Sequence, residues 1–106
     1  MSKIDIGHDL DGMLGSRDKV FVLFYASWCP FSQRFLPIFD KLVQSRPQSC
    51  VCIKTDDNAR LCERYSVEVV PTVLFFENGK VAERLDGSAG VGLSEKQLAD
   101  FVNDCC

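Results

Sequence analysis

The sequence has little of what several large classes of protein require. Its longest apolar run, residues 20–26, is far shorter than the 20 or so residues of a membrane-spanning helix. Twelve Lys and Arg residues against fifteen Asp and Glu give a net charge of −3, too acidic for a nucleic-acid-binding surface. Residues 1–5 lack the basic and apolar regions of a signal peptide. We therefore expect a cytoplasmic protein without nucleic-acid or membrane partners.

Metal-ligand patterns are also missing. His8 is the single histidine, and no two of the six cysteines are separated by two residues, so neither a metal nor a resident cofactor is expected. A secreted disulfide scaffold would have fewer core-forming residues than this chain of 106 residues, which is 46% hydrophobic. We expect one domain over residues 1–106, with reduced cysteines of which at least one is reactive.

Apolar segments alternate between strand-like and helix-like patterns. Residues 19–26 are continuously apolar after Lys19, as in a strand buried on both faces. A helix over residues 29–46 follows, in which Pro37 is expected to produce a kink. The other expected strands are 3–6, 49–55, 72–77 and 80–86; the other helices are 8–15, one capped by Asp57 or Asn58, and one after the capping box of Ser94 and Gln97. The order β-α-β-α-β-α-β-β-α predicts a three-layer α/β/α sandwich with a mixed central sheet.

The segment YASWCPFS, residues 25–32, places Cys29 where a buried strand gives way to a helix. Cys29 suits the N-cap and Pro30 the first helical position, which needs no amide hydrogen. The amides of Phe31 and Ser32, together with the positive end of the helix, would then favour the thiolate form of Cys29. Because only a thiolate attacks disulfides, this placement predicts thiol–disulfide exchange.

A second informative segment precedes the strand at residues 72–77. Pro71 cannot donate to a sheet ladder, so Val70-Pro71 is expected to form a turn or a strand entry. The Asn78-Gly79 pair predicts a tight hairpin after the strand. Together these segments resemble the thioredoxin superfamily over nearly the whole chain. The matching parts are KVFVLFYA, Ser27-Trp28-Cys29, Pro37, Val70-Pro71-Thr72, the FFENGK hairpin and Gly87.

This resemblance implies a thioredoxin fold in which Cys29 attacks a disulfide and a cis Pro71 lies opposite it. An extended client would pair with the Val70 backbone by strand addition. The implied catalytic residues are Cys29 and Ser32, and the implied substrate-binding residues are Trp28, Pro30, Phe31, Val70 and Pro71. The implied partners are protein or small-molecule disulfides and thiols, with a thioredoxin-type reductase or glutathione as reductant.

Two residues depart from the family pattern. Ser32 stands where the family has its second cysteine, and a hydroxyl can donate a hydrogen bond to a thiolate but cannot resolve a mixed disulfide. Leu23 stands where many thioredoxins have a buried aspartate that assists proton transfer. The departures predict monothiol exchange, completed by glutathione as co-substrate, by another small thiol, by the substrate or by a different cysteine.

Three alternatives remain open from the sequence. The chain could be a non-enzymatic module that binds peptide clients, a glutaredoxin-like module that uses glutathione, or a Cys→Ser trap variant of a dithiol thioredoxin. Turnover with glutathione separates the enzymes from the binding module. Of the other cysteines, Cys50, Cys52 and Cys62 are expected to be packing residues, whereas Cys105 and Cys106 are expected in an exposed tail.

Overall fold

The computed structural model describes residues 12, 14–15, 17–46, 49–88 and 91–105. The expected strand at 3–6 lies outside these ranges, and of the expected helix at 8–15 only Gly12, Leu14 and Gly15 are described, all of them helical. The elements are β1 (Lys19–Tyr25), α2 (Pro30–Ser45), β2 (Cys50–Lys54), a 3-10 turn η2 (Thr55–Asp57), α3 (Ala59–Arg64), β3 (Thr72–Glu77), β4 (Lys80–Asp86) and α4 (Glu95–Cys105).

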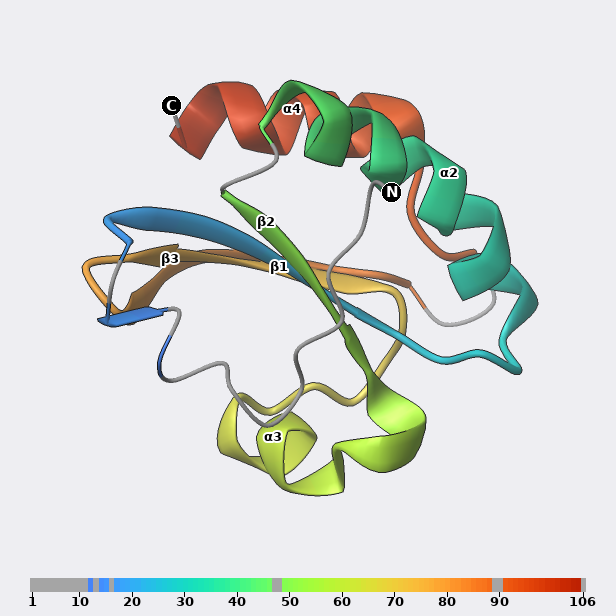
Figure 1. Cartoon of the computed structure of the whole chain (residues 1–106). Helices are drawn as coiled ribbons and strands as arrows, with labels where there is room; N and C mark the ends of the chain where they lie inside the picture. The colour runs from blue at the N-terminus through green and yellow to red at the C-terminus, as the bar shows by residue number, and fades with distance from the viewer. Residues whose placement is uncertain (1–11, 13, 16, 47–48, 89–90, 106) are drawn as a thin grey trace.

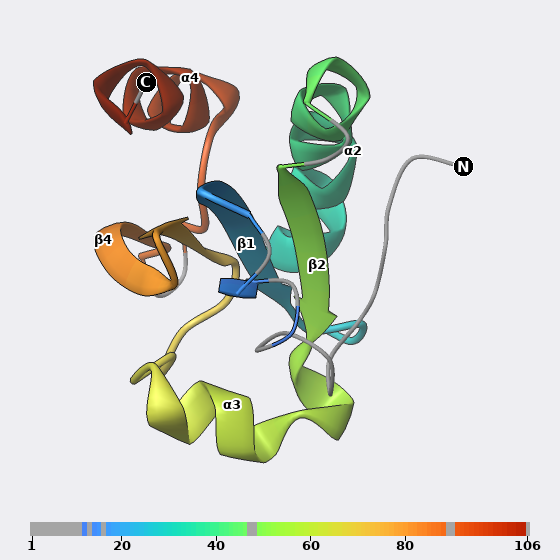
Figure 2. The same cartoon turned by 60° about the vertical axis from the view of Figure 1, so that its left-hand side comes forward.

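The four strands form one mixed sheet in the order β2-β1-β3-β4. β1 is parallel to β2 and antiparallel to β3, and β3 is antiparallel to β4. Helices α2 and α4 cover one face of the sheet, and α3 lies on the other (Figures 1 and 2). The expected α/β/α layering is thereby confirmed for the described residues.

β1 separates two hydrophobic clusters because successive side chains of a strand point to opposite faces. Phe21 and Leu23 belong to the cluster beneath α2 and α4, which also contains Cys50 and Cys52. Val20, Val22 and Phe24 belong to the cluster on the α3 side. Residues 20–24 are at most 1% exposed, so this strand is buried on both faces as predicted.

Helix α2 buries one stripe of side chains at a spacing of four residues. Phe35, Phe39 and Val43 are buried, whereas Pro37 is exposed within the helix. The helix continues through Pro37 to Ser45, where the Arg46 amide donates to the Leu42 carbonyl at 2.8 Å. Cys29 is the N-cap, as expected, and Arg46, at the end of the expected helical range, is the C-cap.

The hairpin and the start of the last helix lie where their local signals predict. Asn78 and Gly79 have φ angles of 53° and 84°, as a two-residue hairpin turn requires. Ser94 and Gln97 bond reciprocally, with the Ser94 amide 2.9 Å from Gln97 Oε1 and the Gln97 amide 3.1 Å from Ser94 Oγ. β4 lies at one edge of the described sheet and is largely exposed, and its pairing with β3 shifts register between Phe75 and Phe76.

Two expectations are corrected. Asn58 occupies the N-cap of α3, but its side-chain amide donates to the Lys54 carbonyl at 2.7 Å and not toward α3. Cys105 is not part of an exposed tail, because it ends α4 and packs half-buried against the first hydrophobic cluster. Cys106 lies outside the described residues.

Candidate active site

Cys29 occupies the junction between β1 and α2 that the sequence predicts. It is the N-cap of α2 and 6% exposed, and Pro30 is the first helical residue. Its amide donates to the Ala26 carbonyl at 3.3 Å, and its carbonyl accepts the Gln33 amide at 3.0 Å. The expected hydrogen bonds from helix amides to the sulfur are not formed, consistent with a thiol being a weak acceptor. The first turn of α2 contains no acidic residue, so no carboxylate there opposes a thiolate.

Ser27 is tied to a residue far away in the sequence. Its hydroxyl donates to Asp56 Oδ2 at 2.6 Å, and its amide donates to Asp56 Oδ1 at 3.2 Å. On the other side, the Gln33 side-chain amide donates to the Ser27 carbonyl at 2.7 Å. The hydrogen bond from the Ser27 hydroxyl lowers the pKa of Asp56 below its ordinary value of 3.8. These contacts fix the backbone immediately before Trp28 and Cys29.

From the sequence alone, Asp56 is not identified as part of the site. The signal lies in the strand register, because Tyr25 of β1 pairs with Lys54 of β2. Ser27 and Asp56 each follow their strand partner by two residues, and the carboxyl ends of adjacent parallel strands meet at one edge of a sheet. The pairing therefore brings the two side chains together.

Ser32 is fully buried one helical turn after Cys29. Its Oγ accepts the Ala26 amide at 3.2 Å, which links the start of α2 to the end of β1. With one acceptor site of the oxygen engaged, the hydroxyl hydrogen is oriented away from Ala26 and can serve as a donor. Leu23 is also fully buried and lies between Cys52 and Val73 in the sheet register, so this position provides no acid or base.

A cavity of about 320 Å³, here named the Cys29 groove, opens beside the thiol. It brings together four of the predicted site residues, Trp28, Cys29, Phe31 and Val70. Pro30, Ser32 and Pro71 lie outside its lining. The remaining lining residues are Thr55, Cys62, Val67, Glu68, Val69 and Ser88.

Pro71 is buried at the start of β3, and the Val70–Pro71 peptide bond is cis. Its carbonyl accepts the Gly87 amide at 3.0 Å. A Cβ atom at Gly87 would collide with this carbonyl, so a glycine is required for the close approach of the two backbones. This contact fixes the segment that carries Val70 to the groove.

Phe31 is held between two neighbours. The Arg34 guanidinium lies over its ring, 5.1 Å from the centroid, and Gly92 lies next to its Cβ and one edge of the ring. Gly92 has a φ of +81°, which residues with a side chain rarely adopt, and a Cβ there would lie 3.0 Å from the Phe31 Cβ. Any larger residue would therefore have both a strained backbone and a close contact with Phe31. Near this contact, Val91 is 72% exposed, and Trp28 in the groove is 71% exposed. Such exposed apolar side chains provide contact area for a partner.

Cys62 and Glu68 are the groove residues with reactive or charged side chains that sequence reasoning did not place in the site. Cys62 is half-buried on α3 and packs against the second hydrophobic cluster, as expected, while it also lines the groove. Burial raises the pKa of the Cys62 thiol. Within the described ranges, no cluster of three or more His, Cys, Asp or Glu side chains is arranged to hold a metal ion.

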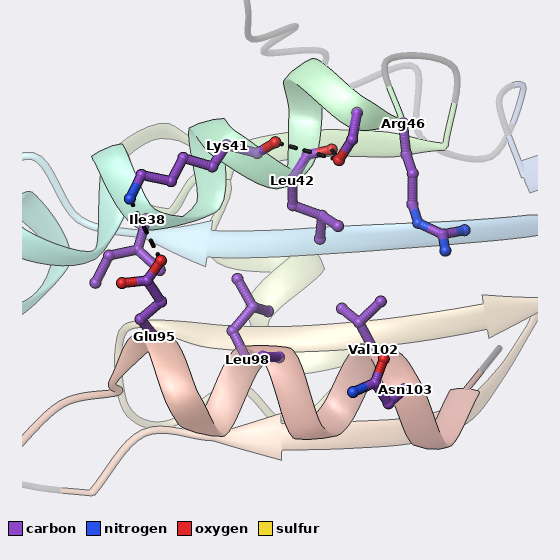
Figure 3. A pocket seen from close by; sticks show the side chains of 10 residues that line it. Ile38, Lys41, Leu42, Arg46, Glu95, Leu98, Val102 and Asn103 are labelled. Atoms are coloured by element: carbon purple, nitrogen blue, oxygen red, sulfur yellow. Dashed lines mark hydrogen bonds and ion pairs between the residues drawn. The ribbon is translucent and has the colours of Figure 1, made fainter.

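A second cavity, here named the α2–α4 groove, lies between those two helices and also measures about 320 Å³ (Figure 3). Ile38, Leu42, Leu98 and Val102 line it with apolar atoms. At one end Lys41 Nζ pairs with Glu95 Oε2 across the helices at 3.3 Å. No cysteine is among its lining residues.

Comparisons with known proteins agree on one family. The sequence pattern of the family described as Thioredoxin matches residues 8–104. A thioredoxin of Mycoplasmoides gallisepticum is 34% identical over 80 residues, covering 74% of this chain and 80% of that protein. A chloroplastic M-type thioredoxin of Pisum sativum is 34% identical over 92 residues, covering 85% of this chain and 54% of that protein. The structure of a mutant thioredoxin from Halobacterium salinarum superposes with a TM-score of 0.80 at 27% identity, covering 96% of this chain and 87% of that one.

Proposed function

The chain belongs to the thioredoxin family and has its thiol–disulfide redox chemistry, and we propose that Cys29 alone is the attacking thiol of this protein. The observation that carries the proposal is the place of Cys29. It caps the first turn of a 16-residue helix and borders a groove that also contains Trp28 and Val70. The helix N-terminus stabilises negative charge on the sulfur, and the groove provides room for the second sulfur of a disulfide.

In the first step, the Cys29 thiolate attacks one sulfur of a client disulfide. The client S–S bond breaks, its other sulfur leaves as a thiolate, and a new disulfide joins Cys29 to the client. The Ser32 hydroxyl, oriented by the Ala26 amide, donates a hydrogen bond to the Cys29 sulfur in its thiolate form. Ser32 takes no part in releasing the client, because an oxygen cannot replace sulfur in the exchange.

Client binding depends on both exposed apolar surface and backbone. Trp28, Pro30 and Phe31 provide contact surface at the start of α2, while an extended client pairs with the backbone of Val70 next to Pro71. Protein disulfides and small-molecule disulfides are the proposed substrates, and a thioredoxin-type reductase or glutathione restores the thiol. The expected single domain and cytoplasmic location remain predictions; the pea relative is chloroplastic. None of the described helices combines the length and apolar character that a membrane crossing requires.

The test is thiol mapping after exposure to glutathione disulfide over a pH series. We expect a glutathione adduct on Cys29 before any other cysteine. Cys29→Ser should lose this adduct, while the matched variant Cys105→Ser should keep it. An inert Cys29 beside reactive terminal cysteines would overturn the proposal.

A second candidate function is the binding of clients without turnover. It is favoured by the exposure of two apolar side chains: Trp28 in the Cys29 groove is 71% exposed, and Val91, next to Gly92, is 72% exposed. Catalytic turnover of a peptide disulfide with glutathione would exclude it. Retention of a client by the wild type and by Cys29→Ser, without turnover by either, would support it.

A further inference from the structure

The Cys29 groove contains a second thiol. Of the five described cysteines, only Cys29 and Cys62 line it. Cys50 and Cys52 are at most 1% exposed within the sheet, and Cys105 packs at the end of α4 against the first hydrophobic cluster. Cys62 is therefore the one other described sulfur that borders the space in which a client disulfide would react.

With Ser32 in place of a second cysteine, the release of the client from its mixed disulfide with Cys29 has no assigned nucleophile. The mixed disulfide at Cys29 needs a sulfur nucleophile for its release, and the buried Ser32 hydroxyl, bonded to Ala26, provides none. Cys62 meets the requirement in type and in place. Moreover, α3 has only six residues and none of them is fully buried. A disulfide requires the two Cα atoms to lie within roughly 7 Å of one another, and a short helix without a fully buried residue can adjust to this more readily than a core element can.

We propose that Cys62 is the resolving thiol of the Cys29 site, an inference that rests on the proposed function above. The Cys62 thiolate attacks Cys29 Sγ in the mixed disulfide, and a Cys29–Cys62 disulfide forms. The client sulfur leaves with the bonding electron pair and takes up a proton from water. Over both steps the client disulfide gains two electrons and the two protein thiols lose them. Two glutathione molecules, or the dithiol of a reductase, then return the protein to its reduced form.

The environment of Cys62 suits the second step better than the first. Burial raises the pKa of its thiol, so at neutral pH it is largely protonated and does not compete for incoming disulfides. Once deprotonated, a thiolate of higher pKa is the stronger nucleophile. Client release should consequently accelerate as pH rises, whereas a resolving thiol supplied by solution glutathione would make release depend on glutathione concentration.

The experiment follows a stoichiometric reaction with glutathione disulfide by intact mass and non-reducing peptide mapping. In the wild type we expect a transient glutathione adduct on Cys29, followed by a peptide pair joined through Cys29 and Cys62. In Cys62→Ala the adduct should persist, with release slowed at least about tenfold, which corresponds to about 1.4 kcal/mol in the barrier. Cys105→Ala is the matched control and should behave as wild type.

Four results would overturn the inference, and they differ from one another. A wild-type adduct as persistent as that of Cys62→Ala, or a bond from Cys29 to Cys105, refutes Cys62 while leaving attack by Cys29 intact. No adduct in either protein refutes the proposed function itself. The same substitution in a Ser32→Cys protein distinguishes a chemical role of Cys62 from a structural one. A thiol at position 32 can release the mixed disulfide itself, so Cys62→Ala should not slow release there. Slow release in this double variant would show that Cys62 has a structural role.

Discussion

The Cys29 groove and the α2–α4 groove have the same volume, about 320 Å³ each, but their walls are built differently. The α2–α4 groove lies between the flanks of two helices, and its floor includes Leu98, a buried member of the first hydrophobic cluster. The Cys29 groove is lined by residues that follow β1, β2 and β4, by the segment before β3, by the start of α2 and by Cys62 of α3. Most of its wall therefore comes from segments that connect helices and strands.

The difference shows that volume alone does not identify a reaction site. Backbone amides at a helix start stabilise an anion, and the ends of parallel strands bring side chains from separate segments together. The flanks of α2 and α4 have neither property, since their amides are engaged within the helices. The expected consequence is that substitutions in the α2–α4 groove change stability, whereas substitutions in the Cys29 groove change chemistry.

The largest effect is expected from Leu98→Ala. Loss of this buried side chain should lower the free energy of unfolding by about 3 kcal/mol, because it removes apolar contacts and leaves a cavity. The rate of adduct formation at Cys29 should be unchanged in the folded protein. Denaturant unfolding measures the stability, and the glutathione disulfide reaction measures the rate of adduct formation. Asn103→Ala, an exposed position in the same groove, is the control and should change neither. A Leu98→Ala protein that is folded but unreactive would show that the α2–α4 groove also affects the chemistry at Cys29.

Ser32→Cys should affect the chemistry. A sulfur one turn after Cys29 can resolve the mixed disulfide, so we expect turnover of a peptide disulfide to rise by roughly tenfold, about 1.4 kcal/mol in barrier height. Ser32→Ala should give no gain. If Ser32→Cys gives none either, the apolar Leu23 or the docking surface limits the reaction.

Asp56 offers a smaller, pH-dependent effect at the Cys29 groove. Since its pKa is lowered by the Ser27 hydroxyl, its carboxylate stabilises the native loop above pH 3.8, and this contribution is lost as pH falls through the lowered value. Trp28, the only tryptophan, adjoins Ser27 and should report the change by fluorescence. At neutral pH, Asp56→Ala should have the Trp28 fluorescence spectrum that the wild type has at acid pH, and Asp57→Ala, the control, should have the neutral wild-type spectrum. A wild-type midpoint at or above 3.8 would contradict the expectation.

The smallest effect is expected at the rim of the α2–α4 groove. The side chains of Lys41 and Glu95 are 69% and 63% exposed, so water and salt screen their attraction. A double-mutant cycle with Lys41→Ala and Glu95→Ala should give a coupling energy of about 0.5 kcal/mol or less. A coupling above about 1 kcal/mol would mean that this ion pair fixes the distance between the helices.

Local signals in the sequence predict the elements they act on. β3 and β4 begin and end as expected because Asn78 and Gly79 determine the turn and hence the register. Cys29 could be identified because the change from strand to helix is itself local. Asp56 required the pairing of β1 with β2, which no single segment encodes. Cys62 gave no signal, since a helix of six residues is too short to show a hydrophobic period.

The exposed strand β4, at one edge of the sheet, has a consequence for how the molecule behaves in a crowded solution. An unpaired strand edge invites association with any passing extended chain. On β4 this tendency is opposed by the charged residues Lys80, Glu83, Arg84 and Asp86 and by the register shift opposite Phe75 and Phe76. Indiscriminate sheet growth into fibres is thereby discouraged at this edge, so the client pairing proposed beside Val70 would not be accompanied by polymerisation through β4.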